Sequence, residues 1–221
     1  MDNYPPIEDH GLIGDLQTAA LVDTNGTIDW FCFPRFDSPS VFASLLDAER
    51  GGFCSIRPAT DDYVTRQLYL PNTAILITRF MTEVGVGEVI DFMPVAEGPA
   101  TDRHRLVRLL RVVRGTMDFE AEIQPRFDYG RATHTIEPTE GEGAVFRSGD
   151  QALTVHRVGE FVLHGTERAD IVAVGRGQRV QHRLQRTAAA GGDGVDLVPH
   201  PARRPWFARV IAARPGEAGC G

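Results

Sequence analysis

The stretch Thr27 to Leu46, TIDWFCFPRFDSPSVFASLL, contains two local patterns next to each other. Its first part, 27–33, is rich in aromatic and β-branched residues, which favours a strand, and Pro34 ends the strand because it has no amide donor. Ser38-Pro39 is typical of a helix start, with a capping hydroxyl before a first-turn proline. The apolar residues that follow have helical spacing, so we expect a short helix over 38–47.

Four residues of this stretch, Asp29, Trp30, Arg35 and Asp37, are not needed by a plain core. General acid–base catalysis often uses two carboxylates, and Asp29 and Asp37 are the best pair here, with Trp30 able to stack on a bound ligand and Arg35 able to keep a carboxylate ionised. Alternatively, Arg35 and Asp37 form a turn salt bridge or brace a domain interface, while Trp30 fills the core. We therefore predict these four as substrate-binding or domain-interface residues.

Working outward, the chain predicts a series of short strands joined by turns. Asn25-Gly26 is a strong hairpin signal because both residues tolerate positive φ. Gly85 and Gly87 are expected in one turn and Gly115 in another, whereas Tyr4 to Asp15 is expected to be irregular. The expected strands are 17–23, 26–33, 53–57, 63–70, 74–82, 88–92, 104–114, 118–127, 145–147, 152–158 and 160–164. This pattern indicates a mainly β fold, an antiparallel β-sandwich with one short helix.

After about residue 175 the composition changes. Eight of the 23 basic residues but only three of the 30 acidic ones follow Gly175, and all 23 basic residues are arginines. The segment lacks a sustained period, so we expect a sandwich domain over 1–175 and a poorly ordered tail over 176–221. Out-of-frame reading of GC-rich DNA produces such Arg, Ala, Gly and Pro mixtures, and our hypothesis is a frameshift near Asp170 to Gly177.

The overall composition excludes several classes of protein. A net charge of −7, with an acidic first part, disfavours nucleic acid as a partner. No apolar run is long enough for a membrane span, and the first residues resemble no signal peptide, so we expect a cytoplasmic protein. Cys32, Cys54 and Cys220 match neither a disulfide framework nor a zinc site, which predicts buried thiols. No phosphate loop, nucleophile elbow or dinucleotide fingerprint is present, and no cofactor is expected.

Two further series of basic side chains have simple interpretations. Four histidines lie on different expected strands: His104, His134, His156 and His164. Metal ligands usually lie closer together, so we expect surface or turn histidines and no metal site. Four arginines recur at every third position: Arg105, Arg108, Arg111 and Arg114. We expect them on a solvated face, balanced across a hairpin by Asp118, Glu120 and Glu122.

Several segments resemble one family of bacterial enzymes. They are Tyr4 to Asp15, Thr18 to Val22, Asp29-Trp30, Pro34 to Ser40 with Phe42, and Asp91 to Pro94. Together they are similar to glycoside hydrolase family 15, the trehalase-like and glucoamylase-like group. The resemblance implies a supersandwich-like N-terminal domain that precedes a helical (α/α) barrel with the catalytic carboxylates. The barrel's tryptophan-x-arginine-aspartate motif is missing, so no catalytic residue is carried over to this chain.

The resemblance implies a truncated chain, inactive on its own, whose parent enzyme hydrolyses α-glucosidic bonds with inversion. Trehalose is the expected substrate and maltooligosaccharides the second choice, and the partner is the missing barrel. A free-standing carbohydrate-binding or interaction module is the alternative. A third possibility is an independent hydrolase that uses Asp29 and Asp37. Because the barrel's flank would be exposed near 30–42, weak self-association is also expected.

Overall fold

A computed structural model of the chain describes residues 4–95, 103–139, 143–158, 162–165, 171–178 and 206–213. Its strands all pair antiparallel, which confirms the expected mainly β fold. Of the helices in these residues, none has the length and apolar character of a membrane span. The two short helices are η1 (Ile7–Asp9) and α1 (Phe127–Gly130).

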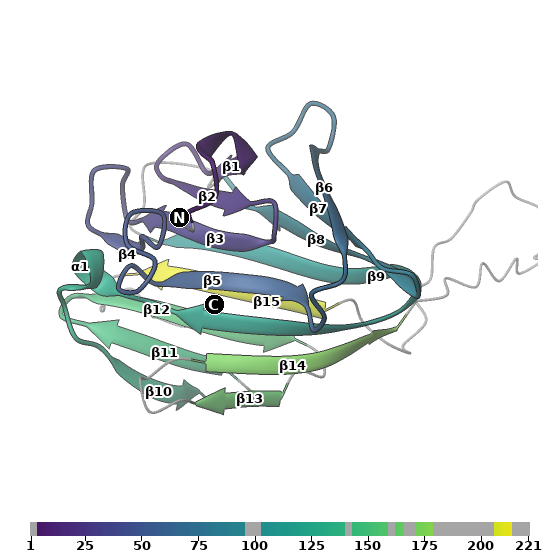
Figure 1. Cartoon of the computed structure of the whole chain (residues 1–221). Coiled ribbons are helices and arrows are strands. Elements are labelled where there is room, and N and C mark those ends of the chain that lie inside the picture. The colour runs from purple at the N-terminus through teal and green to yellow at the C-terminus, as the bar shows by residue number, and fades with distance from the viewer. Residues whose placement is uncertain are drawn as a thin grey trace, which may run out of the picture.

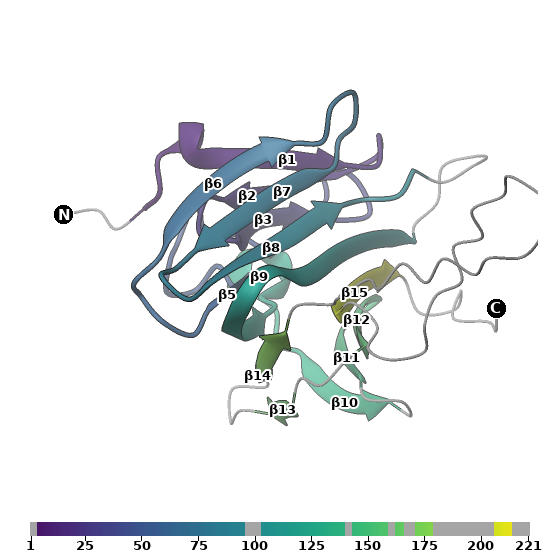
Figure 2. The same ribbon diagram turned by 90° about the vertical axis from the view of Figure 1, so that its right-hand side faces the viewer.

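The strands form two sheets that share one long strand, β9 (His104–Gln124) (Figures 1 and 2). One sheet contains the second half of β9 with β1 (His10–Gly14), β2 (Ala19–Asp23), β3 (Thr27–Cys32), β4 (Ser40–Phe42), β5 (Phe53–Pro58), β13 (Val162–Gly165) and β14 (Ile171–Gln178). The other contains the first half of β9 with β6 (Val64–Tyr69), β7 (Leu76–Met81), β8 (Gly85–Phe92), β10 (Thr135–Thr139), β11 (Gly143–Ser148), β12 (Gln151–Val158) and β15 (Trp206–Ala213).

Gly115 explains how β9 serves both sheets. Its φ is +67°, and an added Cβ would lie 1.9 Å from the Val84 carbonyl oxygen, so only glycine fits. The strand bends there and continues, because a glycine inside a strand permits a sharp bend as well as a turn. The expected hairpin at Gly115 is therefore wrong. The expected turn before β8 is present but ends at Gly85, where the Thr82 N–H donates to the Gly85 carbonyl, whereas Gly87 lies inside β8.

Two other expectations from local sequence, a helix over 38–47 and an irregular first segment, are wrong wholly or in part because these residues pair as strands. Residues 38–47 form no helix: Ser40–Phe42 is β4, which pairs with β3, and turns follow. The first segment is only partly irregular, because His10–Gly14 pairs with β2. The hairpin at Asn25-Gly26 is confirmed, with Gly26 at φ +81° and its N–H donating to the Asp23 carbonyl.

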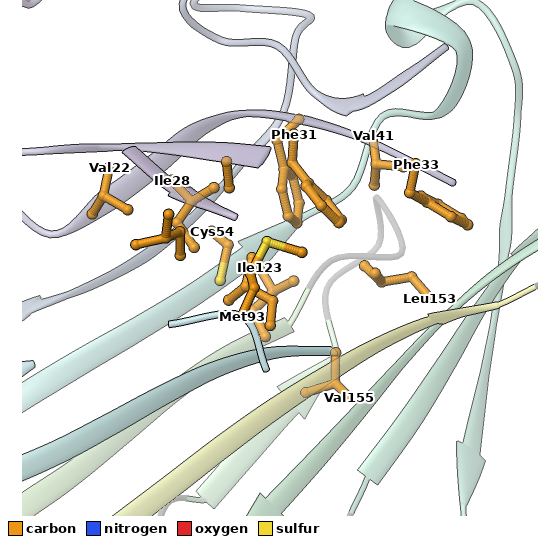
Figure 3. Packing of buried hydrophobic residues seen from close by; sticks show 14 of the residues in the cluster. Val22, Ile28, Phe31, Phe33, Val41, Cys54, Met93, Ile123, Leu153 and Val155 are labelled. Carbon is orange, nitrogen blue, oxygen red and sulfur yellow. The ribbon is translucent and has the colours of Figure 1, made fainter. Parts of the chain in front are cut away.

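The apolar core lies between the sheets. Phe31, Phe33, Val41 and Ile123 come from the first sheet or its loops, and they meet residues of the second sheet such as Leu153 (Figure 3). A smaller cluster stacks Tyr63 edge-on against Phe80, and Phe80 edge-on against Phe119. Large apolar side chains buried in this way supply the main stabilising free energy of a sandwich.

Within the described residues, the segment after Gly175 contributes backbone pairing at two places. The end of β14, 176–178, pairs with β9. Strand β15 lies between β9 and β12 and is antiparallel to both. Residues 179–205 and 214–221 lie outside the described residues, and so does Cys220. Cys32 and Cys54 are free and buried, as expected for them.

Candidate functional site

Asp29 sits at a β-bulge in β3. Val22 pairs with Ile28 and Leu21 pairs with Trp30, so Asp29 is the extra residue between two regular pairs. Its side chain therefore breaks the normal alternation, and Ile28 and Asp29 are both buried although they are consecutive. Bulges redirect side chains in this way and are frequent beside functional sites. Asp29 is only 4% exposed, which is unusual for a carboxylate.

His10 is the partner of Asp29, with His10 Nε2 2.7 Å from Asp29 Oδ2. The other ring nitrogen, Nδ1, lies 2.9 Å from the Pro6 carbonyl oxygen. A carbonyl oxygen only accepts, so Nδ1 carries a hydrogen, and a second proton must lie between Nε2 and Oδ2. His10 and Asp29 thus hold this proton together, as an imidazolium and a carboxylate or as two neutral groups.

The surroundings of the pair shift both pKa values upward. Burial opposes the charged form of His10, but the hydrogen bond and the charge of Asp29 outweigh it and raise the His10 pKa. Burial raises the pKa of Asp29, and the bond from His10 opposes this only in part. The pair therefore retains its proton to a higher pH than a free histidine does.

A groove of about 470 Å³ opens beside the bulge. It is lined by Tyr4, Pro5, Asp23, Asn25, Thr27, Asp29, Ser44, Ala48, Phe53, Ser55, Arg57, Tyr63 and Glu122. Asp23 shapes one wall, because its Oδ1 accepts the N–H groups of Asn25 and Thr27 and fixes the hairpin turn. Burial raises the Asp23 pKa despite these bonds. Asp29 Oδ1 is buried and has no hydrogen-bond partner.

Arg35 and Asp37 form a separate ion pair in the loop after β3. Arg35 Nε lies 3.0 Å from Asp37 Oδ1 and Nη2 lies 2.9 Å from Oδ2, a two-bond arrangement. The two side chains are 70% and 71% exposed. Phe36 between them is 62% exposed. This loop thus presents an aromatic ring between two paired charges.

Trp30 is half-buried and contacts α1. Its ring centroid lies 6.3 Å from that of Tyr129, and the Arg131 guanidinium lies 5.6 Å from the Tyr129 ring centroid. Asp128 and Tyr129 have φ values of 52° and 56°, which non-glycine residues rarely adopt. Trp30 is therefore neither a core residue nor a freely exposed platform.

The turn between β1 and β2 lies at the same end of the fold as the Arg35 loop, since the Thr18 hydroxyl donates to the Cys32 carbonyl at the end of β3. We name this end, residues 15–18 and 34–39, the end surface. Leu16 at its tip is 82% exposed and has φ 75°. A leucine with positive φ is strained, and such strain in a well-supported segment often marks a functional site.

Asp15 and His104 support that turn from inside. Asp15 Oδ1 accepts the N–H groups of Gln17 and Thr18, and its Oδ2 lies 2.5 Å from His104 Nδ1. Burial would raise the Asp15 pKa, but these bonds together lower it. His104 is 1% exposed, so the expectation of a surface or turn histidine is wrong for it.

Arg105, Arg111 and Arg114 are exposed, as expected for a solvated face, but Arg108 is not. The expected balance by Asp118, Glu120 and Glu122 across a hairpin is wrong, because these residues continue the same strand, β9.

Arg108 is fully buried and binds Asp91 through two bonds, Nε to Oδ1 at 2.8 Å and Nη2 to Oδ2 at 3.1 Å. It also donates to the carbonyls of Gly26 and Cys54, both at 2.6 Å. Arg111 binds the buried Glu88. Arg108 thus joins the second sheet to a turn and a strand of the first.

The four predicted site residues therefore lie at three different places in the fold. Asp29 lies in the buried bulge, Trp30 against α1, and Arg35 with Asp37 on the end surface. Asp29 is paired with His10 and Asp37 with Arg35, so the two carboxylates belong to separate ion pairs. Sequence reasoning did not single out His10, although it lies inside the segment Tyr4 to Asp15. Within the described part of the chain, no three His, Cys, Asp or Glu residues are grouped to hold a metal ion.

Known proteins resemble the chain over most of its described length. The family described as "Trehalase-like, N-terminal" matches residues 2–161. The trehalase of Thermoplasma volcanium is 34% identical over 160 residues, which cover 70% of this chain and 25% of that protein. Trehalase 1 of Sulfolobus acidocaldarius is 45% identical over 121 residues, 54% of this chain and 19% of that protein.

The trehalase of Mycolicibacterium smegmatis is 34% identical over 159 residues, 63% of this chain and 23% of that protein. No solved structure matches. The chain spans about a quarter or less of the length of these curated relatives.

Proposed function

The chain belongs to the trehalase-like, N-terminal family, and we propose that it is the non-catalytic docking domain of a trehalase-type enzyme. In this proposal the parent is a member of glycoside hydrolase family 15. A helical barrel holds its acid and base, and it hydrolyses the α-glucosidic bond of trehalose with inversion in the cytoplasm. The barrel is the domain's partner, and the α-glucoside is met only in the full-length enzyme.

One observation carries the non-catalytic role: the buried carboxylates of the described residues are already engaged. Four of them have a basic partner: Asp15 is bonded to His104, Asp29 to His10, Asp91 to Arg108, and Glu88 to Arg79 and Arg111. The fifth, Asp23, accepts the N–H groups of Asn25 and Thr27. An inverting glycosidase needs two carboxyl groups that face each other with a water between them. Asp29 and Asp37, with separate partners, do not favour an independent hydrolase.

The end surface supports a docking role. Leu16 and Phe36 are large, exposed and apolar, and each lies in a turn that ion pairs or hydrogen bonds hold rigid. Apolar anchors on fixed turns beside polar groups are typical of interface centres, because little backbone freedom is lost on binding. Arg35 and Asp37 would surround the anchor as a polar rim.

Two assays test the proposal. The purified chain should release no glucose from trehalose above the rate without protein, and release at enzymatic rates would disprove the non-catalytic role. In the second assay, residues 2–161 replace the N-terminal segment of the Thermoplasma volcanium trehalase, which matches this chain over 160 residues. The chimera should hydrolyse trehalose, and adding Leu16→Asp with Phe36→Ser should cost most of that activity.

Arg66→Ala is the matched control in the chimera, since Arg66 is exposed on β6 and its side chain donates to the carbonyl of its neighbour Thr65. If the Leu16 and Phe36 changes left the chimera as active as the control, the end surface would not be the docking surface.

A further inference from the structure

We propose that Tyr69 covers the free edge of β1, and that uncovering this edge lets a second copy of the chain pair with it. Among the described residues, β1 pairs with β2 alone, so it is an edge strand of its sheet. Tyr69 belongs to β6, which forms an edge of the other sheet and lies beside β1 in Figure 2. The inference concerns contact between copies of this chain and does not depend on docking to a barrel.

The Tyr69 hydroxyl makes the two bonds that a neighbouring strand would make. The Leu12 N–H donates to Tyr69 Oη at 2.7 Å, and Oη donates to the Leu12 carbonyl oxygen at 2.9 Å. In an antiparallel ladder, a residue of a bonded pair uses its N–H and its C=O with the same opposite residue. Both backbone groups of Leu12 therefore point away from β2, and a single hydroxyl satisfies them because it can donate and accept.

The other end of β1 is covered in a different way. His10 is the previous residue whose backbone alternates with that of Leu12, and its N–H donates to the Ile7 carbonyl at the end of η1. Exposed strand edges with unpaired N–H and C=O groups are templates for pairing with another chain. With the His10 donor occupied by η1, Leu12 is the position at which the edge opens when Tyr69 leaves.

Gln67 holds this part of β6 against the first sheet. Its Nε2 donates to the carbonyl oxygens of Val22 and Asp23, at 3.3 and 3.1 Å, where β2 ends. On the inner side, Gly11 of β1 lies so close to β7 that an added Cβ would be 2.5 Å from Leu76 Cδ2. The two sheets are therefore in fixed contact here, and the tyrosine reaches β1 from a strand that is held in place.

The place of Leu12 in β1 indicates why a second copy fits this edge. Leu12 is the middle residue of the five in His10–Gly14. An antiparallel pair of two β1 strands centred on Leu12 has two-fold symmetry, and each Leu12 then receives from the other the two bonds that Tyr69 supplies. Leu12 is also 54% exposed, so the two opposed side chains would bury apolar surface. Pairing requires the end of β6 to move aside, because Tyr69 and Gln67 reach across this edge.

Amide hydrogen exchange measured by NMR on the full chain tests the cover. Tyr69→Phe keeps the ring and removes both bonds, so the Leu12 amide should exchange roughly tenfold faster or more. Tyr4→Phe is the matched control, because the Tyr4 hydroxyl also binds one backbone N–H, that of Ala48 at 3.3 Å, outside β1. Unchanged exchange of the Leu12 amide in Tyr69→Phe would overturn the proposal.

Sedimentation velocity tests the second copy, in a Leu16→Asp background that removes association through the end surface. The double variant Gln67→Ala with Tyr69→Ala frees the end of β6 and should sediment as a dimer at concentrations where the background chain and its Tyr4→Ala variant are monomers. Adding Leu12→Pro removes the edge N–H without removing a bond to β2, and it should restore the monomer. A double variant that stays monomeric, or a dimer that Leu12→Pro leaves intact, would refute pairing through this edge.

Discussion

Replacing Arg108 with methionine measures how far one buried ion pair stabilises the sandwich. Methionine keeps the length of the stem, but it leaves Asp91 buried without a partner and removes the donors to the Gly26 and Cys54 carbonyls. Removing one partner of a buried pair costs about 3–5 kcal/mol. Each orphaned carbonyl adds about 1–3 kcal/mol, although such losses are not additive. We expect a loss of at least about 4 kcal/mol.

The chain provides its own control in Arg35 and Asp37. This pair has the same two-bond geometry, but its side chains are 70% and 71% exposed, whereas those of Arg108 and Asp91 are 0% exposed. Exposed pairs contribute about 0–1 kcal/mol, so Arg35→Met should change stability by less than about 1 kcal/mol. The two substitutions then differ in burial and in the two carbonyl bonds that Arg108 makes to Gly26 and Cys54.

Urea unfolding followed by tryptophan fluorescence gives both values. Small domains have total stabilities of about 5–15 kcal/mol, so Arg108→Met should be largely unfolded or have a far lower midpoint. The double variant Arg108→Met with Asp91→Leu should recover part of the loss, because no charge is then left buried. If Arg108→Met fell within about 1 kcal/mol of Arg35→Met, the argument from burial would be wrong.

Four other outcomes are expected. The pKa of His10 is raised, so the stability that protonated His10 contributes is complete below its ordinary pKa of 6.5 and is lost as pH rises through the folded pKa, with Asp29 and Asp23 as the charges that face it. His10→Gln should therefore flatten the fall in urea midpoint above pH 6.5, and an unchanged slope would contradict this. Leu16→Gly should be neutral or stabilising by up to about 1 kcal/mol in thermal unfolding because it relieves a positive φ, whereas Leu16→Ala should show no such gain. Burial raises the Cys32 pKa to about 11, so in a Cys220→Ser background a thiol reagent at about pH 8 should label the folded chain slowly and the urea-unfolded chain fast. Light scattering should show weak, concentration-dependent self-association that Leu16→Asp reduces, and a sharp monomer peak at high concentration for the parent chain would count against an apolar end surface.

Sequence reasoning succeeded where the signal is local. Asn25-Gly26 specifies its turn through the backbone freedom of two adjacent residues, and the structure has that turn. The sequence-based prediction of a helix over 38–47 failed. The capping residue and the helical spacing are present there, but β4 pairs with β3 instead. Propensity is a weak preference, and a neighbouring strand that needs a partner can override it.

The missed site residues depend on contacts between distant segments. His10 meets Asp29 across 19 residues, and Arg108 meets Gly26 across 82. Nothing near Arg108 distinguishes it from the exposed Arg105, because both alternate with apolar residues on one strand. Only the sheet register decides which arginine faces Asp91. The bulge that buries Asp29 is equally invisible locally, since it depends on how β2 aligns with β3.

The shared strand β9 determines how the domain unfolds. Its first half is hydrogen-bonded to β8 and β15 and its second half to β5 and β14, so its amide hydrogens lie inside both ladders. Neither sheet can separate without exposing this strand, which couples the two layers into one cooperative unit. In hydrogen exchange, the amides of β9 on both sides of Gly115 should therefore be released together and last, while those of the outer strand β6 are released by smaller, independent fluctuations.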